Sequence, residues 1–180
     1  MNVLIAGGSG LIGSALTTTL QSRGDKVTGV SRSPSLDEVA WNEITPELME
    51  DFDAVINRAG ESIAGRWTKA KKKKILESRV ATTSTIALAI ADSKNPPQCL
   101  IQASAAGFYG NRGDEILNES SSTGEGFLAE VCRQWEAAAF PVEEAGTRLV
   151  MPRFGIVLAE GPGALGRLVL VTKLLIGGPH

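Results

Sequence analysis

The sequence has little of what several common site types require. Its one histidine is the last residue, His180, which excludes histidine-dependent catalytic triads and multi-histidine metal sites. The two cysteines, Cys99 and Cys132, stand far apart and in no metal-binding spacing. We therefore predict no metal site, and we interpret both cysteines as reduced core residues of a cytoplasmic protein.

An excess of one charge and long apolar runs are also missing. The 180 residues carry 18 Lys and Arg against 20 Asp and Glu, a net charge of −2, whereas a general nucleic-acid binder needs a basic field. The lysine-rich run at 69–74 has no interleaved aromatic residues, and we interpret it as the solvated face of a helix. No apolar run reaches the roughly 18–20 residues of a membrane helix, and the first residues lack the basic region of a secretory signal. We expect neither nucleic acid nor a membrane as a partner.

Short apolar strand patterns alternate with helical patterns along the chain. The spacing predicts helices near 13–22, 68–91 and 127–139, and strands at Asn2–Ala6, Lys26–Val30, Ala54–Asn57, Cys99–Ala103 and within Arg148–Leu158. Short buried strands separated by helices are typical of a parallel sheet that is covered on both faces. With right-handed crossovers, the pattern predicts an α/β fold of the Rossmann type, a doubly wound parallel sheet.

A glycine-rich turn follows the first strand pattern and opens the first helix. Its glycines Gly7, Gly10 and Gly13 permit a tight turn, close approach of the backbone to a pyrophosphate, and tight helix–strand packing. The free N–H groups and the positive dipole end of the helix then meet the phosphates. The alternative, a glycine turn without a ligand, is disfavoured by the strand–turn–helix context. The segment predicts a dinucleotide site that includes Gly7, Ser9, Gly10, Leu11, Ile12 and Gly13.

The end of the second strand pattern indicates which dinucleotide binds. An acidic residue there would hold the ribose hydroxyls of NAD, but the sequence reads Ser31, Arg32, Ser33 and Pro34. Ser31 can donate a hydrogen bond, and Arg32 can form a charge-assisted fork with a 2′-phosphate. We therefore predict NADP(H) as the cofactor. The alternative for Arg32 is a solvated surface arginine.

Several segments together resemble the extended short-chain dehydrogenase/reductase superfamily. More closely, they resemble its atypical branch of nucleoside-diphosphate-sugar epimerase-like proteins, some of which carry cell-division-inhibitor labels. The matching segments are GGSGLIG at 7–13, SRSP at 31–34, NRAGESI at 57–63, RWT at 66–68, SR at 78–79, SAAGFYG at 104–110, GFLAEVCRQWEAAA at 126–139 and RFGIVL at 153–158. They cover nearly the whole chain in the family's order, and the combination is specific although each segment alone is not.

The resemblance implies further contacts to the cofactor. The turn after the third strand should pack on the adenosine side through Asn57, Arg58, Ala59 and Gly60. Arg58 stands where the family pattern usually has leucine, so its contact is expected from the backbone. Arg79, on the long helix, should face the cofactor, with a helix-surface arginine as the alternative. Val157 falls where extended relatives bring a strand end past the nicotinamide.

The resemblance also reveals which chemistry is missing. Short-chain dehydrogenases use a Tyr-x-x-x-Lys pair, in which the lysine lowers the pKa of the tyrosine that exchanges a proton. The one tyrosine, Tyr109, is followed four residues later by Gly113, and no lysine occurs between Lys94 and Lys173. The helix expected to carry the pair begins with Phe127, which has no proton to give.

Ser104 and Tyr109 are the catalytic candidates that the sequence retains. Ser104 follows the fourth strand pattern, at the edge where sites form in open α/β sheets, and lies within one residue of the family's hydroxyl position. The alternatives are a strand-end serine that bonds backbone and a tyrosine that packs. For Glu136, a further polar residue nearby in the motif, we expect hydrogen bonds to neighbouring backbone.

Two functions of different class follow. The first is an NADP(H)-dependent oxidoreductase or nucleotide-sugar epimerase with a degenerate active site and an unknown small-molecule substrate. The second is a non-catalytic NADP(H)-binding regulator or redox sensor associated with division. The resemblance divides the chain into a dinucleotide-binding domain at 1–160 and the start of a truncated substrate-covering region at 161–180. We expect an exposed apolar face at 168–176, which a missing segment or a second copy in a homo-oligomer would cover.

Overall fold

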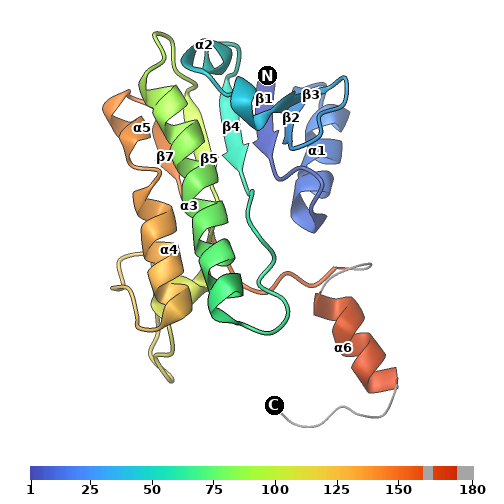
Figure 1. The fold of residues 1–180 in the computed structure, drawn as a ribbon, viewed down its shortest axis with the longest axis vertical. Helices are drawn as coiled ribbons and strands as arrows, with labels where there is room; N and C mark the ends of the chain where they lie inside the picture. Colours follow the sequence, from blue (N-terminus) through green and yellow to red (C-terminus); the bar gives the residue numbers. More distant parts are fainter. Residues whose placement is uncertain (160–163, 174–180) are drawn as a thin grey trace.

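The computed structural model of the chain describes residues 1–159 and 164–173, and its centre is a six-stranded sheet (Figure 1). The strand order is β3-β2-β1-β4-β5-β7, and every pairing is parallel. The strands are β1 (Asn2–Ala6), β2 (Lys26–Ser31), β3 (Glu38–Ala40), β4 (Ala54–Asn57), β5 (Cys99–Gln102) and β7 (Arg148–Val150). The strand order reverses between β1 and β4, which is where such sheets form a crevice at their carboxyl edge. The predicted Rossmann-type fold is confirmed.

Helices cover both faces of this sheet. One face carries α1 (Leu11–Ser22), and the other carries α2 (Pro46–Met49), α3 (Lys69–Ala91), α4 (Phe127–Ala137) and α5 (Pro141–Glu144). Alternate residues of β1 divide between the two faces, as the twofold period of a strand requires. Leu4 joins the cluster that includes Ile86 and Ile90 of α3, whereas Ile5 joins the cluster that Leu16 of α1 covers.

The predicted last strand is wrong in one respect, because it is two strands. β7 ends at Val150, and Pro152, which has no N–H for a ladder, separates it from β8 (Arg153–Phe154). β8 leaves the main sheet and pairs with β6 (Ser104–Ala105) in a second, two-stranded sheet. Where the chain passes from the main sheet to the second one, the Ser104 N–H donates to the Pro152 carbonyl over 2.9 Å.

Other differences concern short elements. The predicted pattern contained no counterpart of β3, β6, α2, α5 or the 3₁₀ turns η1 (Trp41–Glu43) and η2 (Ala106–Tyr109). The helix predicted to reach residue 139 ends at Ala137, and Pro141 then occupies the first turn of α5, where proline is tolerated. Elements of two to four residues are too short to show a period in the sequence.

The last described element is α6 (Ala164–Lys173). Its Val169 and Leu170 are 42% and 58% exposed, in agreement with the expected apolar face as far as that face is described. Residues 174–176 of the face, and the domain boundary expected at 160–161, lie outside the described residues. No helix in the described ranges combines the length and the apolar character that crossing a membrane requires.

Candidate functional site

A cleft of about 490 Å³ opens at the carboxyl edge of the sheet, where β1, β2 and β4 end. Three segments form it: the glycine turn after β1, the loop after β2, and the loop after β4. The lining residues are Gly7, Gly8, Ser9, Gly29, Val30, Ser31, Arg32, Ser33, Glu38, Trp41, Ala59, Gly60, Glu61, Ser78 and Thr82. The structure thus brings together predicted residues from all three segments at the switch point of the sheet.

The glycine turn has no room for side chains at two of its positions. Gly7 has a φ of +83°, and a Cβ there would lie 2.8 Å from the carbonyl carbon of Arg58. A Cβ on Gly13 would lie 2.2 Å from the Gly7 oxygen. Gly10 is the N-cap of α1 and supplies no side-chain cap, so the first N–H groups of the helix, at Leu11 and Ile12, have no intrahelical acceptor. The turn therefore presents bare backbone N–H groups, which suits an anion such as a diphosphate.

The end of β2 carries a cation at the edge of the cleft, Arg32. Arg32 is exposed, lines the cleft, and has no hydrogen bond or ion pair to any described residue. Beside it, the Ser31 hydroxyl accepts a hydrogen bond from the Ser33 N–H over 3.2 Å. This arrangement leaves the guanidinium free to bind an anionic ligand.

A carboxylate missed by sequence reasoning lies in the same cleft. Glu38 of β3 is opposite Gly29, where an added Cβ would lie 2.9 Å from the Glu38 Cγ. Its Oε2 accepts hydrogen bonds from the Ser35 N–H and hydroxyl, at 2.9 and 3.0 Å, so the side chain holds the loop between β2 and β3. Trp41 of η1 lines the cleft as well. No sequence signal marked either residue, because β3 and η1 are too short to predict.

Asn57, a predicted cofactor residue, lies beneath the cleft rather than in it. Its side chain is fully buried, and its Nδ2 donates to Thr83 Oγ1 at 3.1 Å and to Gln102 Oε1 at 2.8 Å. Its Oδ1 accepts from the Ala59 N–H at 3.1 Å, and the Trp135 indole donates to Thr83 at 3.0 Å. This network ties β4, β5, α3 and α4 together and fixes the backbone of Ala59, which does line the cleft.

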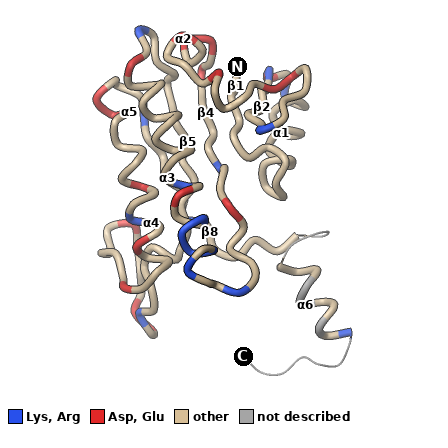
Figure 2. The backbone as a smooth tube through the Cα atoms, in the orientation of Figure 1, with Lys and Arg blue, Asp and Glu red and all other residues tan. Residues whose placement is uncertain are grey.

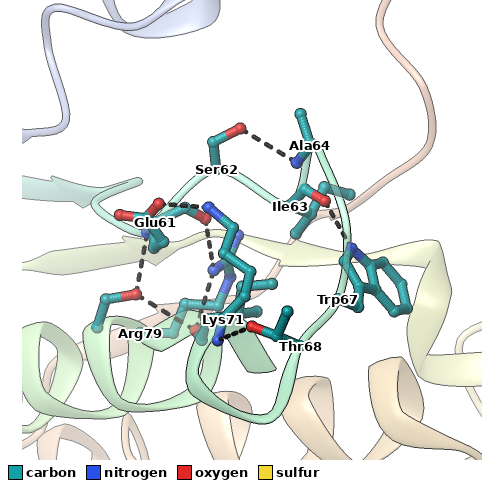
Figure 3. Close-up of polar contacts among 10 residues, drawn as sticks. Glu61, Ser62, Ile63, Ala64, Trp67, Thr68, Lys71 and Arg79 are labelled. Atoms are coloured by element: carbon teal, nitrogen blue, oxygen red, sulfur yellow. Dashed lines mark hydrogen bonds and ion pairs between the residues drawn. The ribbon is translucent and has the colours of Figure 1, made fainter. Parts of the chain in front are cut away.

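Arg79 supports the loop after β4 (Figure 3). Its Nη1 donates to the carbonyls of Glu61 and Ile75, at 2.9 and 3.0 Å, and its guanidinium lies 5.1 Å from the centre of the Trp135 ring. Burial lowers the pKa of Arg79. Among the described residues its contacts are with protein groups behind the cleft, and the same helix reaches the cleft through Ser78 instead.

The lysine-rich start of α3 is only partly a solvated face. Figure 2 shows the basic segment as a stretch of blue in the lower half of the sheet-containing part. Lys71 Nζ lies 2.5 Å from Glu61 Oε1, and this hydrogen bond lowers the pKa of the Glu61 carboxyl (Figure 3). Lys72 lies over the ring of Phe127, 5.1 Å from its centre. Lys71 and Lys72 thus connect α3 to the loop after β4 and to the start of α4, whereas Lys73 is exposed as predicted.

Aromatic packing occupies the place where the tyrosine of the usual catalytic pair was expected. The rings of Phe127 and Trp67 meet edge to face with centres 5.6 Å apart. The Trp67 indole donates to the Ile63 carbonyl over 2.7 Å, and Thr68 caps α3 by accepting from the Lys71 N–H (Figure 3). Phe127 thus packs against the loop and supplies no proton.

Ser104 and Tyr109 come together through a buried ion pair. The Ser104 hydroxyl donates to Glu136 Oε1 over 2.5 Å, and both residues are nearly inaccessible to solvent. Arg153 donates to the two Glu136 oxygens at 2.8 and 2.9 Å and to the Tyr109 hydroxyl at 2.9 Å. The guanidinium also lies 3.5 Å from the centre of the Phe108 ring. The expectation that Glu136 bonds neighbouring backbone is wrong, because its partners are 17 and 32 residues away in sequence.

The other predicted site features are peripheral to the cleft. Val157 follows β8, is 39% exposed and does not line the cleft. Both cysteines are free; burial raises the pKa of the Cys132 thiol, which donates to the Ala105 carbonyl. Within the described ranges, no group of three or more His, Cys, Asp or Glu side chains has the arrangement of a metal site.

Known proteins match the chain over most of its length. The sequence pattern of the NAD dependent epimerase/dehydratase family matches residues 3–132. The epimerase family protein SDR39U1 of Bos taurus is 39% identical over 183 residues, which cover 99% of this chain and 62% of the relative. The crystal structure of human epimerase family protein SDR39U1 (isoform 2) with NADPH is 37% identical, with a TM-score of 0.87, and the match covers 99% of this chain and 62% of that one.

A bacterial structure is similar as well. The nucleoside-diphosphate sugar epimerase from Corynebacterium glutamicum is 38% identical, with a TM-score of 0.84, over 100% of this chain and 38% of that chain. The chain therefore spans 62% of the length of the two SDR39U1 relatives and 38% of the bacterial one. A family pattern that covers most of the chain agrees with the glycine turn and the sheet order, and the chain belongs to the NAD dependent epimerase/dehydratase family.

Proposed function

We propose that the chain binds NADP(H) across the carboxyl edge of the sheet. The observation that carries the proposal is the cleft itself, which joins the glycine turn to Arg32, a cation that pairs with none of the described residues. The positions of Gly7 and Gly13 have no space for a Cβ and leave the α1 N–H groups for the diphosphate. The NADPH in the human relative's crystal structure supports the same choice of cofactor.

Arg32 is the residue that selects the 2′-phosphate in this proposal. A guanidinium forms paired, charge-assisted hydrogen bonds to a phosphate, whereas the unphosphorylated ribose of NAD(H) offers it no charge. Glu38 opposes this preference by its charge, but Ser35 holds its carboxylate through two hydrogen bonds. The balance favours NADP(H) over NAD(H).

Titration of NADPH and NADH by cofactor fluorescence tests the proposal. The chain should bind NADPH more tightly than NADH, and mass spectrometry of the purified protein should find a carried dinucleotide. Equal affinity for the two cofactors would contradict the role of Arg32. Absence of binding to either would overturn the proposal.

The use of the cofactor follows from the residues near α4. NADP(H) supplies hydride transfer at its nicotinamide when bound. The expected proton donor is absent, since Phe127 packs against Trp67 and general acid–base assistance is typically worth ~10²–10⁴-fold. Tyr109 and Ser104 carry the hydroxyls closest in sequence to the usual site, and both belong to the Glu136–Arg153 cluster. We therefore propose slow oxidoreductase or epimerase chemistry with a degenerate proton-transfer set.

A specific observation favours the second function, a non-catalytic NADP(H)-binding regulator or sensor. Ser104 is buried, and its proton points to Glu136, so it has no free hydroxyl to offer a substrate in this arrangement. Single-turnover oxidation of bound NADPH with nucleotide-sugar and carbonyl substrates separates the two functions. A rate that falls in both Tyr109→Phe and Ser104→Ala supports the enzyme, and binding without turnover supports the regulator.

A further inference from the structure

The backbone of Arg58 is fixed against the glycine turn. Its N–H donates to the Ala6 carbonyl over 2.9 Å, which extends the pairing of β1 and β4 by one residue. Its carbonyl carbon and oxygen lie 2.8 and 2.9 Å from the position that a Cβ on Gly7 would take. Arg58 therefore cannot move away from the turn without disrupting the end of the sheet.

The side chain of Arg58 extends along the same turn towards the start of α1. Its Nη1 lies 3.9 Å from the position of a Cβ on Gly10, the N-cap of α1. Its guanidinium lies 5.9 Å from the centre of the Phe154 ring of β8. The cation is thus placed between the glycine turn and the second sheet.

No described residue accepts a hydrogen bond from this guanidinium. Its Nε is buried without an acceptor, and burial lowers the pKa of Arg58. The two other partly buried arginines of the site differ, because Arg79 donates to two carbonyls and Arg153 to a carboxylate. A buried guanidinium N–H without an acceptor is costly unless a ligand satisfies it.

We propose that the Arg58 side chain binds the diphosphate of the dinucleotide. The proposal rests on the proposed function, and it assigns to the diphosphate a cation in addition to the N–H groups of α1. The guanidinium fork matches two phosphate oxygens, and the helix dipole adds to the same positive field. Since NAD(H) and NADP(H) carry the same diphosphate, Arg58 strengthens the binding of both, whereas Arg32 distinguishes between them.

The test is to compare Arg58→Leu and Arg58→Lys with the unchanged chain. Removal of a charge-assisted hydrogen-bonding group should weaken NADPH and NADH alike, by about ten- to a hundredfold, and leave their affinity ratio unchanged. Arg58→Lys keeps the charge but not the fork and should lose less. Two fragments locate the contact: ADP-ribose, which has the diphosphate, should weaken with the cofactors, whereas adenosine 2′-monophosphate should bind Arg58→Leu as well as the unchanged chain.

Each outcome has a distinct meaning. If the unchanged chain binds no dinucleotide, the proposed function fails. If it binds NADPH and Arg58→Leu binds equally well, only the role of Arg58 fails. Melting temperatures without ligand verify folding; should Arg58→Leu not fold, Arg58→Gln decides by the same two criteria, with unchanged affinity overturning the inference.

Discussion

At the carboxyl edge of the sheet, the region around the glycine turn and the region of β6, β8 and α4 satisfy their charged side chains differently. Around the turn, Arg32 and Arg58 have no acceptor among the described residues, and backbone N–H groups at the start of α1 are bare. Around β8, Arg153 donates hydrogen bonds to Glu136 and Tyr109 and lies over the Phe108 ring. The first region therefore has cations and N–H groups that an anionic ligand can bind, whereas in the second region the Glu136 carboxylate already binds the cation.

The difference predicts that the region around the glycine turn contributes to ligand binding and that the region around β8 contributes to stability. A cation that makes no hydrogen bond to the described protein groups contributes little to folding, so its substitution should change ligand affinity more than stability. A buried pair loses free energy as soon as one partner is removed, so its substitution should change stability more than affinity. The following predictions test this division, from the largest expected effect to the smallest.

Gly13→Ala should disrupt the glycine turn and thereby cause the largest loss of cofactor binding. Its Cβ would lie 2.2 Å from the Gly7 oxygen, so the turn must move and the N–H groups proposed to bind the diphosphate are displaced. We expect NADPH affinity to fall by about a hundredfold or more, measured by fluorescence titration. Gly24→Ala is the control for a glycine substitution outside the cleft: its φ of +85° makes alanine strained there, but no atom lies within 4 Å of its Cβ position and it does not line the cleft, so NADPH affinity should stay unchanged. A Gly13→Ala chain that binds NADPH normally would show that the turn is not the diphosphate site.

Glu136→Gln should instead lower the free energy of unfolding, by about 3 kcal/mol, because it leaves the partly buried charge of Arg153 without its buried counter-ion. Urea unfolding measures the loss, and NADPH affinity should stay unchanged. Glu130→Gln is the matched control, since it breaks an exposed pair with Arg133 on the same helix and should scarcely change the free energy of unfolding. If both substitutions lowered the free energy of unfolding by the same amount, the Glu136–Arg153 pair would have no special role in stability.

Arg32→Ala should lower NADPH affinity by about tenfold and leave NADH affinity nearly unchanged, since only NADPH carries the 2′-phosphate. The arginine is exposed, so the melting temperature should not move. Arg133→Ala serves as a control arginine outside the cleft and should change neither affinity. Equal losses for NADPH and NADH in Arg32→Ala would mean that Arg32 acts on a shared part of the cofactor.

Glu38→Gln sharpens the comparison within the cleft. The amide oxygen can still accept from Ser35, but the negative charge near the proposed 2′-phosphate is removed. At separations of about 8 Å in a water-like dielectric, one charge is worth roughly 0.5 kcal/mol, so NADPH should bind about twofold more tightly. The gain should shrink as salt is added, because exposed charges are screened. Weaker NADPH binding would instead show that Glu38 orders the loop through its charge.

Local patterns in the sequence predict the main sheet and the glycine turn. The strand Asn2–Ala6 has four buried apolar residues in a row after Asn2, and the glycine turn follows it directly, so the local sequence identifies both. The same reasoning missed Glu38, which reaches the cleft only because three residues of β3 pair with β2. Such a short pairing has no period of its own.

Contacts between distant segments could not be predicted either. Glu136 pairs with Ser104 and Arg153 because β8 leaves the main sheet after Pro152 and pairs with β6. The sequence marks the proline but not the new partner of the strand that follows it. Arg79 was likewise expected at the cofactor, and its orientation depends on the Trp135 ring and two loop carbonyls supplied by other elements.

The buried network at Asn57 has a consequence for how this chain can vary over evolution. The Asn57 amide donates to Thr83 and Gln102 and accepts from the Ala59 N–H, and the Thr83 hydroxyl accepts from the Trp135 indole. A substitution of any one of these side chains leaves a buried polar atom without its hydrogen-bond partner. It is therefore tolerated only with a compensating substitution at a second position of the network. Substitutions at these positions should therefore appear in natural sequences as correlated sets.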